Sequence, residues 1–310
     1  MTTLVTGGTG FVGQHATAIL AGQDERVLAL DPLPIREELR QAGVEYVRGD
    51  VSDLRSLLAI LAEHGVDRVI HLGSLLAPAS AEDPYRALEV NCAGTQNVFE
   101  AARILRLANV TWASSMAVFG HSAAALAEGE GELLTEHTPH SPDNAYGATK
   151  SYCEHISRAY RQRYGVNCVG LRIGLVYGAG KERGEGLFTE QLFQRPALGQ
   201  PGVVPYGDDV YCWQYVRDVA EAFTLVSCLD STDNAVYNLP GTVLTMVGAV
   251  ETVRALVPSA ELTVEPGVLG FPYRIDASPL TALLGDSLRL TSIRDGFAAT
   301  IEGIAARAGR

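Results

Sequence analysis

The pattern Tyr146-Gly147-Ala148-Thr149-Lys150 pairs a phenol with an ammonium group at a spacing that allows proton chemistry. Residues four apart share one face of a helix, so the two side chains can act on the same reacting atom. A neighbouring cation lowers the free-energy cost of forming a phenolate, which moves a tyrosine pKa from about 10 towards neutrality. The pair predicts a tyrosine acid or base, and it is informative because Lys150 and Lys181 are the only lysines in the sequence.

Two hydroxyl groups precede this pair at the end of an apolar run, Trp112-Ala113-Ser114-Ser115. Open α/β sheets place their ligands at the carboxyl ends of their strands. Ser115 is therefore a candidate to hydrogen-bond a substrate oxygen beside Tyr146. The alternative for a single serine at such a place is a turn residue.

A glycine-rich segment near the start of the chain, Thr6-Gly7-Gly8-Thr9-Gly10-Phe11-Val12-Gly13, has the spacing of a dinucleotide-binding turn. In such a turn Gly7 permits a tight bend, Gly10 lets the backbone approach a pyrophosphate, and Gly13 lets the helix pack on the strand. Asp31 ends the next apolar run 18 residues after Gly13, close to the ~20 expected for the acid that binds the adenosine ribose. Its carboxylate would repel a 2′-phosphate, so the pattern favours NAD over NADP.

Short aliphatic or β-branched runs alternate with amphipathic segments and predict the elements that position these groups. Strands are expected at residues 3–6, 26–30, 45–48, 68–71, 110–113 and 167–171, and helices at 54–63, 83–107 and 146–164. The strands lack a polar face, which is typical of a parallel sheet covered by helices on both sides. The sequence therefore predicts an α/β fold with a doubly wound parallel sheet, of the Rossmann type.

The alternation loosens after about residue 173, where the sequence becomes rich in Gly and Pro. We expect residues 1–173 to form an NAD-binding domain that also receives residues 209–240. Residues 174–208 and 241–310 would form a smaller C-terminal substrate-binding region. Later elements are expected at 217–229, 236–239, 246–255 and 293–306.

Composition excludes several classes of function. The 310 residues carry 24 basic and 36 acidic side chains with no basic run, whereas a nucleic-acid groove requires a concentrated positive patch. No apolar stretch reaches the roughly 18 residues of a membrane span, and the five cysteines form no CxxC pattern. We therefore expect a cytoplasmic protein with no nucleic-acid or membrane partner. His137 and His140 lie in a Pro-rich loop, so no metal site is expected there.

Taken together and in this order, the motifs resemble the extended short-chain dehydrogenase/reductase family, also described as the NAD-dependent epimerase/dehydratase family. The resemblance runs from residue 2 to about residue 178. Besides the glycine-rich segment and Asp31, it rests on Gly49-Asp50-Val51, His71-Leu72-Gly73, Val90-Asn91, Gly94-Thr95, Ser114-Ser115, Val118-Phe119-Gly120, Tyr146-x-x-x-Lys150, Leu171-Arg172 and Val176-Tyr177-Gly178.

The resemblance implies a role for each matching residue. Those that would lie along NAD are Gly7, Gly10, Phe11, Val12, Gly13, Asp31, Asp50, Val51, Leu72, Gly73, Asn91, Tyr146 and Lys150. Catalysis would fall to Ser115, which orients the reacting oxygen, to Tyr146, which exchanges its proton, and to Lys150, which binds the nicotinamide ribose. Helices equivalent to 87–107 and 152–164 pair across a two-fold axis in this family, which implies a homodimer.

The second half of the chain bears on the substrate. Family members that act on sugar nucleotides clamp the substrate pyrophosphate with two arginines, and an ungapped comparison places Tyr211 and Pro266 at or near those positions, although Arg217 or Arg274 could substitute. A small hydroxylated substrate without a nucleotide is therefore expected, such as a hydroxy acid, a sugar acid or a related alcohol or ketone. The candidate substrate contacts are Ser74, Ser115, Lys181, Arg183, Tyr211, Trp213 and Arg274.

Three functions remain open from the sequence. The first is an NAD-dependent dehydrogenase of a small hydroxylated substrate. The second is a nucleotide-sugar epimerase or dehydratase that holds its NAD tightly. The third is a non-catalytic NAD-sensing protein, against which the intact Ser115, Tyr146 and Lys150 set argues.

Overall fold

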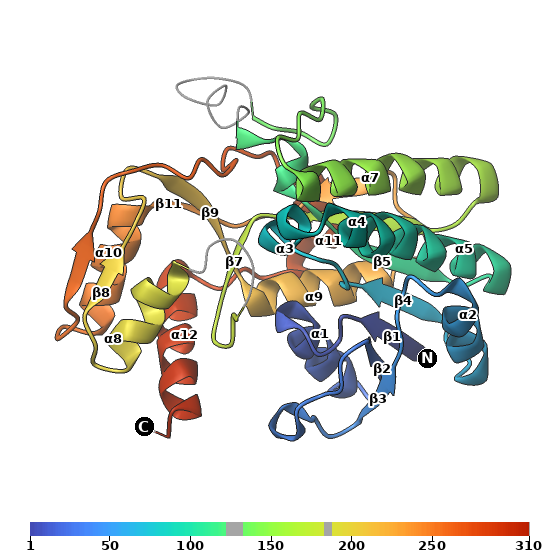
Figure 1. Cartoon of the computed structure of the whole chain (residues 1–310), viewed down its shortest axis with the longest axis horizontal. Helices are drawn as coiled ribbons and strands as arrows, with labels where there is room; N and C mark the ends of the chain where they lie inside the picture. Colours follow the sequence, from blue (N-terminus) through green and yellow to red (C-terminus); the bar gives the residue numbers. More distant parts are fainter. Residues whose placement is uncertain (122–132, 183–187, 310) are drawn as a thin grey trace.

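The main sheet of the computed structural model is parallel throughout, and the structure describes residues 1–121, 133–182 and 188–309. Seven strands lie in the order β10-β6-β5-β4-β1-β2-β3. Figure 1 labels β1 to β5 of this sheet. Their bounds are β1 Thr2–Thr6, β2 Arg26–Asp31, β3 Val44–Arg48, β4 Arg68–His71, β5 Asn109–Ser115, β6 Cys168–Ile173 and β10 Val236–Asn238. The chain runs outward from β1 in one direction and from β4 in the other, so a crevice is expected at the carboxyl ends of these two strands. The doubly wound Rossmann fold predicted from the sequence is confirmed.

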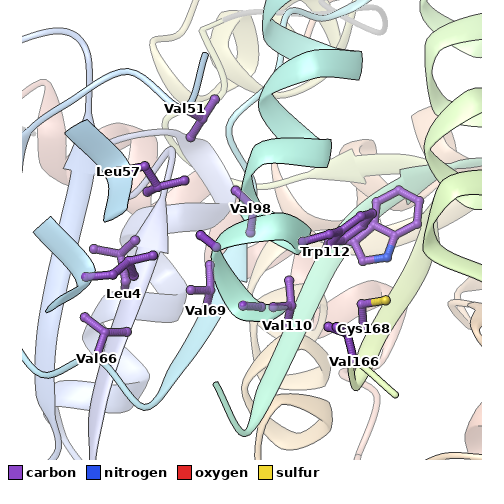
Figure 2. Close-up of a cluster of buried hydrophobic side chains, with 14 of the residues drawn as sticks. Leu4, Val51, Leu57, Val66, Val69, Val98, Val110, Trp112, Val166 and Cys168 are labelled. Carbon is purple, nitrogen blue, oxygen red and sulfur yellow. The ribbon is translucent and has the colours of Figure 1, made fainter. Parts of the chain in front are cut away.

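Helices bury the apolar residues on both faces of this sheet. On one face lie α2 (Leu54–Glu63), α5 (Thr95–Leu105) and α7 (Ala145–Tyr164). On the other lie α1 (Phe11–Ala21), α9 (Val216–Ser227) and α11 (Ser278–Leu284). Figure 2 shows part of the first cluster, in which Leu4, Val69 and Val110 of three strands meet Leu57 of α2 and Val98 of α5. Burial on both faces explains why the strands carry no polar face.

Helix α7 has a defined start and end. The Asn144 side chain accepts a hydrogen bond from the Gly147 N–H at 2.8 Å, as an N-cap residue does. Gly165 ends the helix at φ +67°, a conformation that glycine adopts without strain. The cap places Tyr146 in the first turn of α7 and Lys150 one turn further along.

A smaller region lies beside the main sheet (Figure 1). Strands β7 (Leu175–Tyr177), β9 (Val210–Tyr215) and β11 (Thr242–Thr245) form a three-stranded sheet, and β8 (Gly202–Val204) pairs with β12 (Leu262–Val264). Helices α8 (Arg195–Ala197), α10 (Met246–Leu256) and α12 (Ile293–Arg307) belong to this region. Its core is aromatic, with the rings of Phe193 and Phe297 centred 4.8 Å apart.

The packing departs from the predicted division of the chain at two elements. Strand β9, expected to return to the first domain, pairs with β7 and β11 instead. Helix α11, expected in the substrate-binding region, packs against the main sheet through Leu280 and Leu284. Local sequence patterns specify a strand or helix but not the neighbour it pairs with, which explains both differences.

The helix expected at residues 83–107 is interrupted. Asp83 follows α3 (Ala77–Glu82) and caps α4 (Pro84–Ala87), and a π-helical segment, Leu88–Gly94, precedes α5. Such segments often occur at functional sites. None of the helices in the described ranges has the length and apolar composition needed to cross a bilayer.

Candidate active site

The glycine-rich turn between β1 and α1 brings three backbone segments into close contact. Gly7 has φ +64°, and a Cβ there would lie 2.9 Å from the Gly73 nitrogen. A Cβ on Gly13 would lie 2.2 Å from the Gly7 carbonyl oxygen. Gly10 is the N-cap of α1 and donates to the Gly7 carbonyl at 2.9 Å. The turn therefore presents bare backbone at a helix N-terminus, where N–H groups lack partners within the helix and bind phosphate.

Asp31 lies at the carboxyl end of β2, beside this turn. Its carboxylate accepts hydrogen bonds from the Thr9 hydroxyl at 2.7 Å and the Leu33 N–H at 3.2 Å. Thr9 belongs to the glycine-rich segment, but no feature of the sequence singles it out as a partner of Asp31. These contacts orient the carboxylate at the place where an adenosine ribose would lie.

Asp50 and Val51 follow β3. Asp50 accepts from the Ser52 hydroxyl at 2.7 Å and from Arg86 at 2.6 Å. Burial raises the pKa of Asp50, but the bonds from Ser52 and Arg86 outweigh this effect and hold it below its usual value. Val51 is buried in the first hydrophobic cluster (Figure 2), and its side chain lies against Gly94 of the π-helical segment.

The end of β4 is tied to the glycine-rich turn through Thr6. The Thr6 hydroxyl accepts from the Gly73 N–H at 3.2 Å, and the Leu72 N–H donates to the Thr6 carbonyl at 3.1 Å. The same hydroxyl lies 2.6 Å from His71 Nδ1, and His71 Nε2 lies 3.0 Å from the Thr95 hydroxyl. Burial, with a smaller contribution from the Lys150 charge, lowers the pKa of His71 to about 3. His71 is thus a neutral bridge between β1, β4 and α5.

Asn91 joins the loop after β4 to α7. Its side chain accepts from the Leu75 N–H at 2.8 Å and donates to the Leu75 carbonyl at 3.0 Å. The same amide nitrogen donates to the Thr149 hydroxyl at 3.2 Å. The Asn91 carbonyl, within the π-helical segment, accepts from the Cys153 thiol at 3.1 Å. Asn91 is fully buried and supports the start of α7, beside Lys150.

Ser115 and Tyr146 are brought to the same edge of the sheet by a close contact between backbones. Ser115 is the last residue of β5, and its hydroxyl accepts from the Ala117 N–H at 3.2 Å. A Cβ on Gly147 would lie 2.3 Å from the Ala117 carbonyl oxygen, so only glycine lets α7 begin there. Tyr146, the neighbour of Gly147, is half-buried.

Lys150 is buried beneath Tyr146. Its Nζ donates to the Ala113 carbonyl of β5 at 2.8 Å and lies 5.6 Å from the centroid of the Tyr146 ring. Burial lowers the pKa of Lys150. A cation held at this distance from the ring stabilises the phenolate of Tyr146 relative to the phenol.

The expected substrate contacts are placed differently from one another. Ser74 and Arg274 are half-buried, and Lys181 donates to the Val176 carbonyl at 2.9 Å. Arg183 lies outside the described residues. Tyr211 is fully buried and Trp213 is 1% exposed, because alternate residues of β9 point into the aromatic core. Their position gives Tyr211 and Trp213 a packing role and leaves them no surface for a substrate.

The two histidines considered as a metal pair lie in different surroundings. His137 is exposed, whereas His140 lies 2.8 Å from the Ser151 hydroxyl and 3.1 Å from the Glu154 carboxylate. Within residues 1–121, 133–182 and 188–309, no group of three or more His, Cys, Asp or Glu side chains is arranged to hold a metal ion.

This fold and site define a dinucleotide-binding enzyme of the Rossmann type. The chain belongs to the NAD-dependent epimerase/dehydratase family, whose model matches residues 3–239. UDP-glucuronate 4-epimerase 3 from Arabidopsis thaliana is 29% identical over 249 residues, which cover 75% of this chain and 55% of that protein. This chain thus spans little more than half the length of that relative.

Solved structures resemble nearly the whole chain. The NAD complex of UDP-glucose 4-epimerase from Thermus thermophilus has a TM-score of 0.83 and 29% identity, covering 98% of this chain and 99% of that chain. An L-threonine dehydrogenase from Cupriavidus necator has a TM-score of 0.83 and covers 99% of each chain, and at 23% identity it shares the fold.

The cofactor is NAD. The residues present fit it, because the close backbone packing at Gly7 and Gly13 brings the turn to the N-terminus of α1, which can bind a pyrophosphate, and the Asp31 carboxylate suits two ribose hydroxyls. The residues that would hold NAD are those implied by the family resemblance, with Thr9 added as the partner of Asp31.

Proposed function

We propose that the chain is an NAD-dependent oxidoreductase that oxidises a hydroxyl-bearing carbon of a small substrate, or reduces the corresponding carbonyl. The observation that carries this proposal is the placement of Lys150, which is buried, bonded to β5 at Ala113 and 5.6 Å from the Tyr146 ring. A buried cation beneath a half-buried phenol is placed to stabilise the phenolate.

Each of the three catalytic residues has its own role in the proposed reaction. Bound NAD supplies the hydride acceptor or donor. Ser115 donates a hydrogen bond to the reacting oxygen and holds the substrate in place. Tyr146, as phenolate, takes the hydroxyl proton while the carbon loses a hydride, so that the carbon–oxygen single bond becomes a carbonyl. Lys150 favours the phenolate and binds the nicotinamide ribose.

The substrate is proposed to be a hydroxy acid, a sugar acid or a related alcohol or ketone. An ungapped comparison with sugar-nucleotide enzymes of the family places Tyr211 at a pyrophosphate-binding arginine, and a phenol buried in the aromatic core cannot form that contact. The smaller region beside the main sheet would cover the substrate. The second candidate, a nucleotide-sugar epimerase, is favoured by the names of the relatives, which include UDP-glucose and UDP-glucuronate 4-epimerases.

One assay separates these functions. The purified protein receives NAD with hydroxy acids, sugar acids or UDP-sugars, and both the absorbance of reduced cofactor and the stereochemistry of the product are followed. We expect NADH to accumulate with a small hydroxylated compound. An epimerised UDP-sugar without net NADH would establish the second candidate. If neither NADH nor an epimerised sugar is formed, the NAD-sensing protein is the remaining candidate.

We also propose a homodimer, formed through α5 and α7, and a cytoplasmic location. Three large exposed side chains on or beside the face formed by α5 and α7 support the dimer. Tyr85, Leu88 and Tyr152 are 72%, 55% and 41% exposed. The cytoplasmic location is supported by the five unpaired cysteines, which suit a reducing compartment. Sedimentation equilibrium tests the dimer, for which we expect twice the mass of 33.0 kDa.

A further inference from the structure

A buried ion pair lies one helical turn beyond Lys150. Glu154 of α7 and Arg172 of β6 have no exposed surface. The Arg172 guanidinium donates from Nε to Glu154 Oε1 and from Nη2 to Oε2, both at 2.8 Å. A carboxylate held by this two-pronged bond has a fixed orientation as well as a partner for its charge.

Glu154 also reaches the strand that carries Ser115. The hydroxyl of Ser114, the residue before Ser115, donates to Glu154 Oε1 at 2.6 Å. Lys150 donates to the carbonyl of Ala113, the residue before Ser114, at 2.8 Å. Helix α7 therefore holds two consecutive residues of β5, directly before the residue expected to orient the substrate.

The charges around Glu154 are already balanced by groups other than Lys150. Arg172 faces the carboxylate from β6, Arg158 from α7 at 3.3 Å, and His140 from the loop before α7 at 3.1 Å. Burial raises the pKa of Glu154, but the bonds from Arg172, His140 and Ser114 outweigh this effect and bring it to about 2.

A different set of charged or titratable groups acts on Lys150, namely His71 of β4, Cys92 of the π-helical segment and Cys153 of α7. Glu154 is thus suited to act on Lys150 through the position of helix α7 and not through its own charge.

We propose that Glu154 is a positioning residue of the active site, which with Ser114 sets the register of α7 against the end of β5 and so keeps Lys150 beneath Tyr146. This inference rests on the proposed function, because it assigns what holds the Ser115, Tyr146 and Lys150 group together. Small displacements of such groups have large effects, since a shift of about 1 Å can cost on the order of a hundredfold in rate.

The experiment measures the acidity of the Tyr146 phenol, which a purely structural role of Glu154 would not change. Tyrosinate absorbance is titrated with NAD bound, and the titration of Tyr146→Phe is subtracted to isolate Tyr146. The variants are Ser114→Ala, which keeps the Glu154–Arg172 pair, and Glu154→Gln. We expect each to raise the midpoint by about one pH unit, which is a tenfold loss of phenolate at a fixed pH.

A matched control comes from the same helix. Ser157 is also a fully buried serine of α7, and it donates to the Cys168 carbonyl of β6 at 3.5 Å. Ser157→Ala should lower stability without moving the midpoint, and Ser114→Thr, which keeps a hydroxyl, should restore the wild-type midpoint. If a substrate is known, Ser114→Ala should lower kcat about tenfold and leave KM unchanged.

The outcomes separate this inference from the proposed function. An unchanged midpoint in Ser114→Ala overturns the positioning role, as does an equal shift in Ser157→Ala. If Glu154→Gln fails to fold, Ser114→Ala decides alone. A wild-type titration identical to that of Tyr146→Phe below pH 10 overturns both the positioning role and the proposed function, because each requires an acidic Tyr146 phenol. Failure of every substrate in the panel overturns the proposed function but not this comparison, which needs only NAD and the phenol.

Discussion

Single residues in this site act through the few groups that touch them. Lys150 has one described hydrogen bond, to Ala113, and faces the Tyr146 ring. Its charge is desolvated, so its effect on the neighbouring phenol is stronger than it would be in water. Function at this scale can be tested by removing one atom at a time.

Replacing Tyr146 with Phe removes the phenol oxygen and keeps the ring. We expect turnover to fall by at least a hundredfold, because proton transfer by a positioned side chain contributes about 10²–10⁴-fold. NAD affinity should change by less than about threefold, since most of the cofactor contacts lie elsewhere. Steady-state kinetics and fluorescence titration with NADH measure the two effects, and retained turnover would remove Tyr146 from its role.

The lowered pKa of His71 predicts how the free energy of unfolding depends on pH. Its pKa is about 3 in the folded protein and about 6.5 in an unfolded chain, so the unfolded state binds the extra proton between these values. The stability from the neutral ring is complete above pH 6.5 and declines as the pH falls, by about 2 kcal/mol at pH 5.

Urea unfolding at pH 7 and pH 5 measures this decline. In His71→Asn the difference between the two pH values should shrink by about that amount. His155→Gln is the control, because His155 is exposed on α7 and should leave the difference as it is. An identical pH dependence in wild type and His71→Asn would contradict the assignment.

At the scale of elements, the site depends on how closely α7 approaches the end of β5. The Asn144 cap sets where the helix starts, and Gly147 sets how near it lies to Ala117. The π-helical segment adds a third constraint, because its Asn91 carbonyl bonds to Cys153 on the same helix. Three local features thus determine one interface between a helix and a strand.

Gly147→Ala tests that interface. The added Cβ would lie 2.3 Å from the Ala117 carbonyl oxygen and 3.1 Å from Pro142 Cβ, so the start of α7 must move. We expect a loss of about 1–3 kcal/mol in the free energy of unfolding and a larger fall in kcat than in NAD affinity. Ala148→Ser, at the exposed neighbouring position, should leave both unchanged. Wild-type kcat in Gly147→Ala would show that the close approach is not required.

At the scale of the whole molecule, NAD binding should be linked to stability. The proposed cofactor residues come from β2, α1, α7, the π-helical segment and the turns after β1, β3 and β4. A ligand that binds only the folded state stabilises it by about 2.7 kcal/mol at 100 times its Kd. NADP at the same concentration should give a much smaller shift, because its 2′-phosphate would meet Asp31. Thermal unfolding with each cofactor measures this, and equal shifts would contradict the role of Asp31.

The features that depend on short sequence spacing were predictable. The glycine-rich turn, Asp31 at the end of β2, Ser115 at the end of β5 and the placement of Tyr146 and Lys150 on one helix all follow from the periods of helices and strands. The parallel sheet followed from apolar runs that are buried on both faces. These features are local, since each is set by residues within about one element and its turn.

Contacts between residues far apart in the chain were decided only by the tertiary structure. No spacing rule predicts that His71 bridges Thr6 and Thr95, that Glu154 meets Ser114 and Arg172, or that β9 joins the smaller sheet. Tyr211 had the sequence position of a substrate contact, but the alternation along β9 turns it into an aromatic core. The sequence determined which groups could react, and packing determined which are buried, charged and close enough to do so, because burial and distance depend on every element that surrounds them.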